Sequence, residues 1–183
     1  MNKKTQTNKG MTYVELIVVL SIFSVLSSVV IFNYGDFQAK IDVKNLASDI
    51  ALKVVEAQKS SLSGKFDPNA SLGWKPSYGV YFEMAKPTQF VYFADLNNDG
   101  VYNEDPLDTI TITKNDSITG LEAVGCGSIT SLSIVFKRPD SSAAFSSNGS
   151  SLPCASYVQI TIASPKGVTA LIKLYPSGRV QVN

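Results

Sequence analysis

The sequence predicts an α+β fold, in which a long N-terminal α-helix packs on an antiparallel β-sheet domain. Three observations support this prediction. Residues 11–32 form an apolar run, residues from about 37 to 60 show helical amphipathic spacing, and the chain from residue 74 onward alternates short β-type runs with turn signals. A chain of 183 residues is long enough for one ordinary domain with such a helical extension.

The apolar run at residues 11–32 is long enough to cross a bilayer. At about 1.5 Å per residue, a helix of this length covers roughly 33 Å, against roughly 30 Å for the hydrocarbon core. A secretory signal peptide has a shorter apolar core and a small-x-small cleavage site, and the sequence after the run offers no such site. The lysines that precede the run favour a cytoplasmic N-terminus. We therefore expect a membrane helix at residues 11–35, with the remainder of the chain outside the cytoplasm.

One carboxylate, Glu15, interrupts the apolar run near its start. On membrane-insertion scales a charged side chain costs about 2.5–3.5 kcal/mol at the centre of a helix, and less near an end. The run itself contains no cation that could pair with Glu15. An ordinary membrane anchor gives no reason for this residue, so we expect its partner to come from another chain or from a new chain terminus.

The segment KGMTYVEL around Glu15 resembles the prepilin cleavage signal of type IV pilins and of the pseudopilins of type II secretion systems. That signal is a short basic leader ending in Gly, followed by an apolar residue, Thr and, at the fifth mature position, Glu. The resemblance implies that residues 1–10 are a leader, which a prepilin peptidase removes after Gly10. Met11 would then carry the new, methylated amine, and Glu15 would pair with the amine of a neighbouring subunit during assembly.

The resemblance also implies where the protein works and with which partners. It implies a single-pass protein of the bacterial inner membrane, held in lipid before assembly, whose outer domain lies outside the cytoplasm. It further implies that an inner-membrane assembly platform extracts the subunit into an extracytoplasmic filament of pilin or pseudopilin subunits. Ser21, Ser24 and Ser28 share one helix face, which fits close helix packing in a filament and equally the ordinary composition of a spanning helix.

After residue 35 the pattern changes from uniformly apolar to amphipathic. Apolar residues recur at spacings of three and four, which predicts an amphipathic continuation of the helix at residues 36–62, docked on the outer domain. Many pilins have a proline where this chain has Phe32, so a kink would instead sit at Gly35. A breaker-rich loop is expected at residues 61–73. The expected buried face comprises Val43, Ala47, Ile50, Val54 and Ala57.

Residues 63–183 are expected to form the extracytoplasmic antiparallel β domain. Seven short runs rich in β-branched and aromatic residues predict its strands. The Ser-rich stretch at residues 136–153 is expected to be a long exposed loop. Cys126 and Cys154 are interpreted most simply as a disulfide in an exported domain, with two buried free thiols as the alternative. The predicted strands are residues 78–84, 89–95, 108–113, 131–137, 157–164, 169–175 and 178–182.

The segments YGVYF, FADLNNDGVYN, VFKRPD and the terminal SGRV resemble, in this order, the H-type minor pseudopilins and the FimT-like minor pilins. The likeness is dense at the N-terminus of the chain and sparse at residues 114–130 and 139–156. It implies a pilin-like fold and a structural role as a minor subunit that primes or caps the filament.

The segment DLNNDGVYNEDPLD at residues 95–108 is the best candidate for binding a small ligand. Asp95, Asn97 and Asp99 alternate before a glycine, as in the opening half of a calcium-binding loop. The match then fails, because the twelfth position is Pro106 instead of a bidentate Glu. Asn-Asp-Gly is also good hairpin-turn chemistry, for which no ion is needed. The candidate oxygen ligands for calcium are Asp95, Asn97, Asp99, the Val101 carbonyl, Glu104, Asp105 and Asp108.

The composition argues against catalysis and against nucleic-acid binding. The chain has no histidine and two cysteines, which excludes Ser-His-Asp and Cys-His catalysis, His-ligated metals and four-cysteine zinc sites. The net charge is +1, and it is −2 without the lysines of the first ten residues. We therefore expect neither an enzyme nor a nucleic-acid partner.

Two alternatives to a filament subunit remain. One is a monomeric, membrane-anchored binding domain with a coincidental leader sequence. The other is a DNA-uptake minor pilin that binds nucleic acid through basic side chains brought together by the strands. Those side chains are Lys137, Arg138, Lys166, Lys173 and Arg179.

Overall fold

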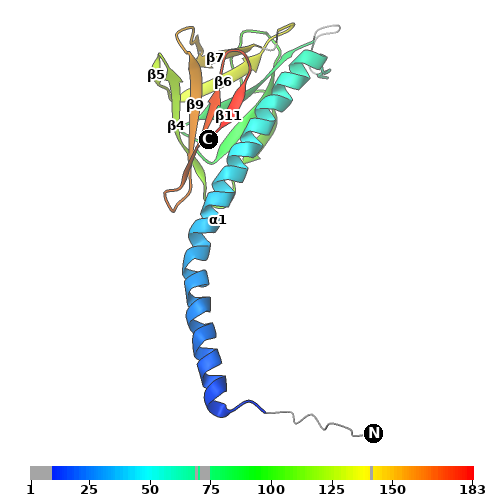
Figure 1. Ribbon diagram of the computed structural model, residues 1–183. Helices are drawn as coiled ribbons and strands as arrows, with labels where there is room; N and C mark the ends of the chain where they lie inside the picture. The colour runs from blue at the N-terminus through cyan, green and yellow to red at the C-terminus, as the bar shows by residue number, and fades with distance from the viewer. Residues whose placement is uncertain (1–9, 69, 71–74, 141) are drawn as a thin grey trace, which may run out of the picture. The chain divides into compact units, whose positions relative to one another are not determined.

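The computed structural model describes residues 10–68, 70, 75–140 and 142–183 (Figure 1). Contacts between Cα atoms divide the chain into two compact units, residues 1–38 and residues 39–183. One helix, α1 (Tyr13–Ser63), contributes to both units and includes Gly35, the position expected for any kink. All the other regular elements of the described chain are β-strands, paired in antiparallel sheets, so the α+β prediction is confirmed at this level.

The second half of α1, from residue 39, buries the apolar face that its spacing predicts. Val43, Ala47, Ile50, Val54 and Ala57 are each at most 1% exposed. These five side chains belong to the same buried cluster as residues of both β-sheets. Because burying a valine or isoleucine side chain contributes about 1.5–3 kcal/mol, this face holds the helix on the β domain.

Gly64 ends α1. Its φ of 61° lies in the left-handed region, which a residue without Cβ adopts readily. The N–H of Gly64 donates to the Ser61 carbonyl at 3.1 Å, and the N–H of Lys65 donates to the Ser60 carbonyl at 3.0 Å. This Schellman pair satisfies two carbonyls of the last turn. Within the breaker-rich loop expected at residues 61–73, residues 69 and 71–73 lie outside the described residues.

Two antiparallel sheets complete the outer domain (Figure 1). The strand order is β3-β2-β1-β6-β7-β8 in sheet A and β11-β10-β9-β4-β5 in sheet B. In each sheet, strands that follow one another in the chain pair as hairpins. The strands are β1 (Ser77–Glu83), β2 (Gln89–Asp95), β3 (Pro106–Thr111), β4 (Ser117–Val124), β5 (Gly127–Ser128), β6 (Ser131–Phe136), β7 (Ala143–Ser147), β8 (Ser150–Ser151), β9 (Tyr157–Ala163), β10 (Thr169–Leu174) and β11 (Val180–Val182).

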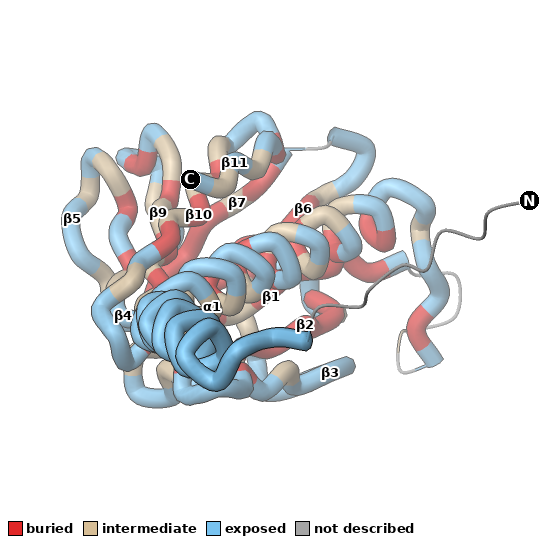
Figure 2. Tube along the Cα trace, turned by 60° about the horizontal axis from the view of Figure 1, so that its bottom comes forward, coloured by how far each residue is buried: buried red, intermediate tan, exposed pale blue. Residues whose placement is uncertain are grey.

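Sheet A is covered on both of its faces. The main core joins residues of α1 and of both sheets, and Figure 2 shows that buried residues are concentrated in the strands. On the other face of sheet A, Val91, Phe93 and Val135 form a second buried cluster, against which Tyr81 and Tyr102 pack. This second cluster explains why successive residues of β2 and β6 are buried, instead of every other one.

The Ser-rich stretch at residues 136–153 is not the long exposed loop that the sequence predicts. It contains β7 and β8, and β7 pairs with β6 in a register that places Ile134 opposite Phe145. Phe145 and Ser146 are 6% and 5% exposed. The prediction is wrong because a Ser-rich composition favours loops locally, whereas pairing with β6 overrides that preference here.

Strand β4 also lies where the sequence predicts no strand. It pairs with β9, and its residues Ile118, Leu121 and Ala123 are buried. The register shifts between Ile118 and Gly120, so the apolar residues do not keep the two-residue alternation that marks a regular strand.

Cys126 and Cys154 form a disulfide, so the prediction of bonded cysteines is confirmed and the alternative of free thiols is wrong. Their Cα atoms lie 5.6 Å apart, within the range for such a bond. The bond joins the turn after β4 to the segment before β9. These two segments are close in space because β4 and β9 are paired neighbours in sheet B.

Candidate functional site

Thr12 caps the first turn of α1. Its Oγ1 accepts the N–H of Glu15 at 3.3 Å, and its carbonyl accepts the N–H of Leu16 at 3.1 Å. Thr12 and Glu15 thus occupy the N-cap and N3 positions of a capping-box sequence, a signal that sequence reasoning missed. Glu15 therefore has a local reason to be acidic, since the positive end of the helix dipole favours a carboxylate there.

The Glu15 carboxylate has no partner of its own in the part of the chain that the structure describes: no hydrogen bond and no ion pair reaches it. Gly10 and Met11, which flank the peptide bond expected to be cut, are exposed and lie before the helix begins. A peptidase acts most readily on such an exposed, non-helical bond.

The first half of α1 presents its apolar side chains outward. The most apolar 18-residue window of this helix has a mean hydropathy of 2.6, and none of that window is buried. The large apolar side chains from Val14 to Phe32 are between 45% and 81% exposed. Ser21 donates its hydroxyl to the Val18 carbonyl at 2.8 Å, so it needs no further partner in an apolar environment. The helix is thus long and apolar enough to span a membrane.

The acidic loop, residues 95–108, joins β2 to β3. Asp95 is the last residue of β2 and is only 2% exposed. One of its carboxylate oxygens, Oδ2, accepts the N–H of Gly100 at 2.9 Å, whereas Oδ1 is buried without a hydrogen-bond partner in the described structure. Gly100 adopts a φ of 83°, which turns the chain back toward Asp95.

Asp99 lies on the exposed side of the same loop and gathers three donors. Its Oδ1 accepts the N–H of Val101 at 2.7 Å. Its Oδ2 accepts the side-chain amides of Asn97 at 2.7 Å and Asn103 at 3.0 Å. The Asn97 Oδ1 in turn accepts the N–H of Asp99 at 3.2 Å. Asp99 is therefore satisfied by its own loop, as in a well-formed hairpin turn.

The two carboxyl groups differ in their acidity. Burial raises the pKa of Asp95, and the charge of Asp99 adds to this, although nearby backbone amides, that of Gly100 foremost, work against it. For Asp99, partial burial acts upward on the pKa, but the hydrogen bonds from Asn103, Val101 and Asn97 outweigh it and the pKa is lowered. Asp95 is thus the carboxyl group whose charged form burial disfavours in spite of these hydrogen bonds.

The structure brings four of the predicted ligand residues around one small cavity. Asp95, Asn97, Val101 and Asp105 line a cavity of about 110 Å³. Asn103 lines the cavity as well, although sequence reasoning missed it. The available signal was its amide oxygen, which lies two residues after Val101 and two residues before Asp105 in the sequence. Within the described residues, no group of three or more His, Cys, Asp or Glu side chains is arranged to hold a metal ion.

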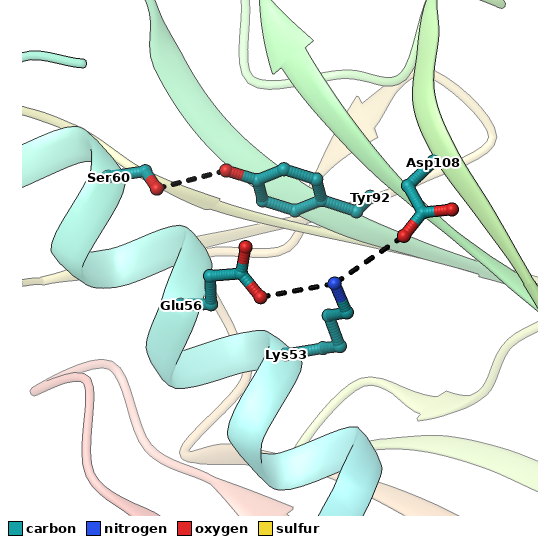
Figure 3. A network of polar contacts seen from close by, with 5 residues as sticks. All are labelled: Lys53, Glu56, Ser60, Tyr92 and Asp108. Carbon is teal, nitrogen blue, oxygen red and sulfur yellow. Dashed lines mark hydrogen bonds and ion pairs between the residues drawn. The ribbon is translucent and has the colours of Figure 1, made fainter.

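Glu104 and Asp108 lie apart from this cavity. Glu104 lines a different pocket beside Tyr81 and Tyr102. Asp108, on β3, is 3.4 Å from the ammonium of Lys53 on α1, which also lies 3.1 Å from Glu56 (Figure 3).

The predicted basic residues are divided between the two sheets. Lys137 follows β6 of sheet A and donates to the Asn98 carbonyl at 3.4 Å. On sheet B, the Lys173 ammonium lies 5.3 Å from the centre of the Tyr157 ring, and the Arg179 guanidinium lies 4.1 Å from that of Tyr175. The two tyrosine rings are themselves neighbours, with 5.4 Å between their centres. We name Lys173, Arg179, Tyr157 and Tyr175 the sheet B cation patch.

Comparisons with protein-family models, with curated proteins and with solved structures found no match to this chain.

Proposed function

We propose that this chain is a structural subunit of a type IV pilus or of a type II secretion pseudopilus, cut after Gly10 and assembled through its N-terminal helix. One observation carries this proposal. Glu15, a carboxylate without a partner in the described structure, stands in the first turn of an exposed apolar helix, five residues after Gly10.

The exposed apolar surface of α1 requires a non-aqueous environment. Apolar side chains cover the helix from Val14 to Phe32, far beyond the scattered apolar residues of an ordinary protein surface. Lipid supplies that environment for a single-pass protein of the inner membrane, because a helix satisfies its backbone groups internally. The same surface, packed against the helices of neighbouring subunits, supplies the contact area for a filament. A helix of this kind therefore serves both the membrane-anchored and the assembled states.

Glu15 gives the association its specificity. Cleavage after Gly10 creates an amine at Met11, a cation four residues, or about one helical turn, before Glu15. An ion pair between Glu15 of one subunit and the Met11 amine of the next compensates both charges in an apolar core, where each alone is costly. The capping box stabilises the turn that carries Glu15, but it supplies no opposite charge.

Replacement of Glu15 tests this function in cells that carry the assembly machinery. We expect Glu15→Leu to be cut after Gly10 as the unmodified chain is, yet to be absent from sheared filaments and retained in the membrane fraction. Glu122→Leu is the matched control, because Glu122 is an exposed residue of β4. If Glu15→Leu enters filaments as efficiently as the control, the chain is instead a membrane-anchored binding domain.

A second candidate function, nucleic-acid binding by a DNA-uptake minor pilin, is favoured by the sheet B cation patch. Two cationic side chains lie over two neighbouring tyrosine rings in this patch. Proteins that bind single-stranded nucleic acids use the same groups, since aromatic rings stack on bases and cations contact phosphates. If this is the function, DNA affinity falls steeply with salt, and the double change Lys173→Ala with Arg179→Ala weakens binding. If the affinity for DNA does not depend on salt, or if the double variant binds DNA as tightly as the unmodified chain, this candidate function is wrong.

A further inference from the structure

We propose that the free edge of β3 binds an extended segment of a partner protein in which basic and apolar residues alternate. The added strand would pair with the backbone of β3 and place its side chains alternately in two pockets that flank this edge. The surface belongs to the outer domain and uses neither Gly10 nor Glu15, so the inference does not depend on the proposed filament function.

The outer edge of β3 has backbone groups without partners. β3 ends the strand order of sheet A, and Figure 2 shows it at the rim of the domain. The N–H of Ile112 donates to the Thr88 carbonyl at 2.7 Å, and in the same register Ile110 is the next residue that bonds to β2. Thr109 and Thr111 alternate with them and therefore direct their N–H and C=O groups away from β2. No other element of the described structure offers these groups a hydrogen bond.

The residues that could protect this edge leave it open. Proline and charged side chains commonly prevent an edge strand from pairing with a further strand. Pro106 stands at the first position of β3, before the free groups, and leaves the N–H of Thr109 and of Thr111 available. The carboxylate of Asp108 is directed to α1, where the Lys53 ammonium lies 3.4 Å away (Figure 3). A further strand therefore meets no obstacle along this part of the edge.

On one face of sheet A, a pocket of about 550 Å³ reaches this edge at Thr109. Tyr81, Tyr102, Glu83 and Glu104 line this outer pocket, and the two rings stack with 4.7 Å between their centres. Burial raises the pKa of both tyrosine hydroxyls, and the charges of Glu83 at Tyr81 and of Glu104 at Tyr102 add to this. Aromatic rings beside carboxylates favour a lysine or arginine side chain, because a cation is attracted to both.

On the other face, a pocket of about 410 Å³ lies between β3 and α1. Leu46, Leu52 and Ile110 contribute apolar side chains to this helix pocket. Leu52 is 66% exposed, although its side chain is large and apolar. An apolar residue of the added strand would cover it, while the next residue points to the outer pocket, since successive side chains of a strand lie on opposite faces. The edge thus favours alternation of basic and apolar residues.

The charge of this surface selects a basic partner. The two pockets and β3 together carry five carboxylates and two ammonium groups, which gives a net charge of −3. A second copy of the same edge would bring the same carboxylates to the contact, and like charges on paired strands are destabilising. The carboxylates are those of Asp49, Glu56, Glu83, Glu104 and Asp108, and the ammonium groups are those of Lys53 and Lys86.

A synthetic peptide tests this edge on the full-length chain in a non-ionic detergent. The probe is Thr-Lys-Val-Lys-Val-Lys-Thr, blocked at both ends and labelled with a fluorophore. Thr-Lys-Lys-Val-Val-Lys-Thr has the same composition without the alternation and is the control. In fluorescence anisotropy we expect saturable binding of the probe, and about tenfold weaker binding of the control, in which a lysine and a valine exchange faces. Equal affinity for both peptides, or no saturable binding of the probe, overturns the proposal.

Two proline variants test whether the backbone of β3 is used. Thr109→Pro removes a free N–H but no bond to β2, and proline is accepted where the N–H of an edge strand faces solvent. It should weaken binding of the probe about tenfold, because a hydrogen bond is lost and the ring obstructs pairing. Val182→Pro is the matched control on β11, the edge strand of sheet B. The N–H of Asn183 donates to the Leu171 carbonyl, so that of Val182 faces away from β10. Equal binding by the two variants contradicts strand addition.

A charge variant keeps the proposal testable if Thr109→Pro is poorly folded. Glu104→Gln should weaken binding of the probe about two- to fivefold, whereas Glu122→Gln, at an exposed position of sheet B, should leave it unchanged. Equal affinity of these two variants is evidence against the outer pocket. Bound probe should also slow hydrogen exchange at the amides of Thr109 and Thr111. If those amides are instead protected by self-association that the probe cannot displace, the occupant is a second copy of the chain and the proposal is wrong.

Discussion

The hydroxyl of Tyr92 donates a hydrogen bond to Ser60 Oγ over 3.0 Å, and both residues are buried (Figure 3). The bond joins β2 of sheet A to the last turns of α1. The ammonium groups of two lysines, Lys53 and Lys65, each lie 5.6 Å from the centre of the Tyr92 ring. Burial raises the pKa of the Tyr92 hydroxyl, so it remains a donor across the physiological range.

This hydrogen bond should be measurable as a coupling between its two partners. In a double-mutant cycle of Tyr92→Phe and Ser60→Ala, we expect a coupling energy of about 0.5–1.5 kcal/mol in the free energy of unfolding. Denaturant unfolding in detergent gives that energy. Additive effects of the two changes would mean that the bond does not contribute to stability.

The ion pairs that surround Tyr92 should matter less. Lys53 and Asp108 have side chains that are 29% and 52% exposed, and water competes for both charges. We expect Asp108→Asn to change the free energy of unfolding by no more than about 1 kcal/mol, and less at high salt. The same unfolding measurement at two salt concentrations checks this; a large, salt-independent loss would contradict it.

The buried face of α1 offers a sharper contrast between neighbouring residues. Ile50 is fully buried, whereas Leu52, two residues later, is 66% exposed. Ile50→Ala should lower the free energy of unfolding by about 2–5 kcal/mol, because it removes buried methyl groups and leaves a cavity. Leu52→Ala should stay within about 0.5 kcal/mol of the unmodified chain. Similar losses for the two variants would show that the helix is docked on a different face.

The contrast between these two residues also shows what the sequence can predict. The three- and four-residue spacing that places Ile50 with Val43 and Ala57 is a property of the helix itself, so it predicts the buried face directly. Strand β2 is predicted at its observed bounds for the same reason, because its apolar and aromatic residues form one short uninterrupted run.

Other elements depend on partners that are distant in the sequence. The serines of β7 give no local strand signal, and they become a strand because β6 lies beside them. In β4 the register shift near Gly120 hides the alternation. The acidic loop shows the same limit. The sequence identifies Asp95, but only the fold shows that its Oδ1 is buried without a hydrogen-bond partner in the described structure. Likewise, only the fold shows that Asp108 forms an ion pair with Lys53 and does not line the small cavity.

The Cys126–Cys154 bond should contribute substantially to stability. The two cysteines are 28 residues apart, and closing a loop of that length in the unfolded chain corresponds to about 3–4 kcal/mol in the chain-entropy model. Replacing both by serine should lower the free energy of unfolding by roughly that amount. Unfolding under non-reducing conditions measures it, and reduction of the unmodified chain should reproduce the loss. An unchanged free energy would show that the bond is structurally dispensable.

The pH dependence of stability should carry the signature of Asp95. Its folded-state pKa is raised above the ordinary value of 3.8, so the folded chain keeps this proton to higher pH than the unfolded chain. Linkage then requires the free energy of unfolding to fall as pH rises from about 3.8 through the raised pKa, and to level off above it.

Other carboxyl groups also contribute to the pH dependence, because the pKa of Asp116 is raised and the pKa of Asp99 is lowered. Both groups are present in Asp95→Asn, so comparison with this variant isolates the contribution of Asp95. In the presence of a chelator, the difference in stability between the two proteins should change across this window, with the unmodified chain losing more stability as pH rises. Urea unfolding at a series of pH values measures the difference. A constant difference between the two curves would contradict a raised pKa.

The most direct test of assembly through a trimmed N-terminus is the intact mass of the protein isolated from its own cells. A chain that begins at Met11 and carries one added methyl group is the expected result. A chain that retains its first ten residues, or one released by a cut beyond Phe32, would contradict the pairing of Glu15 with a new terminal amine and with it the filament function.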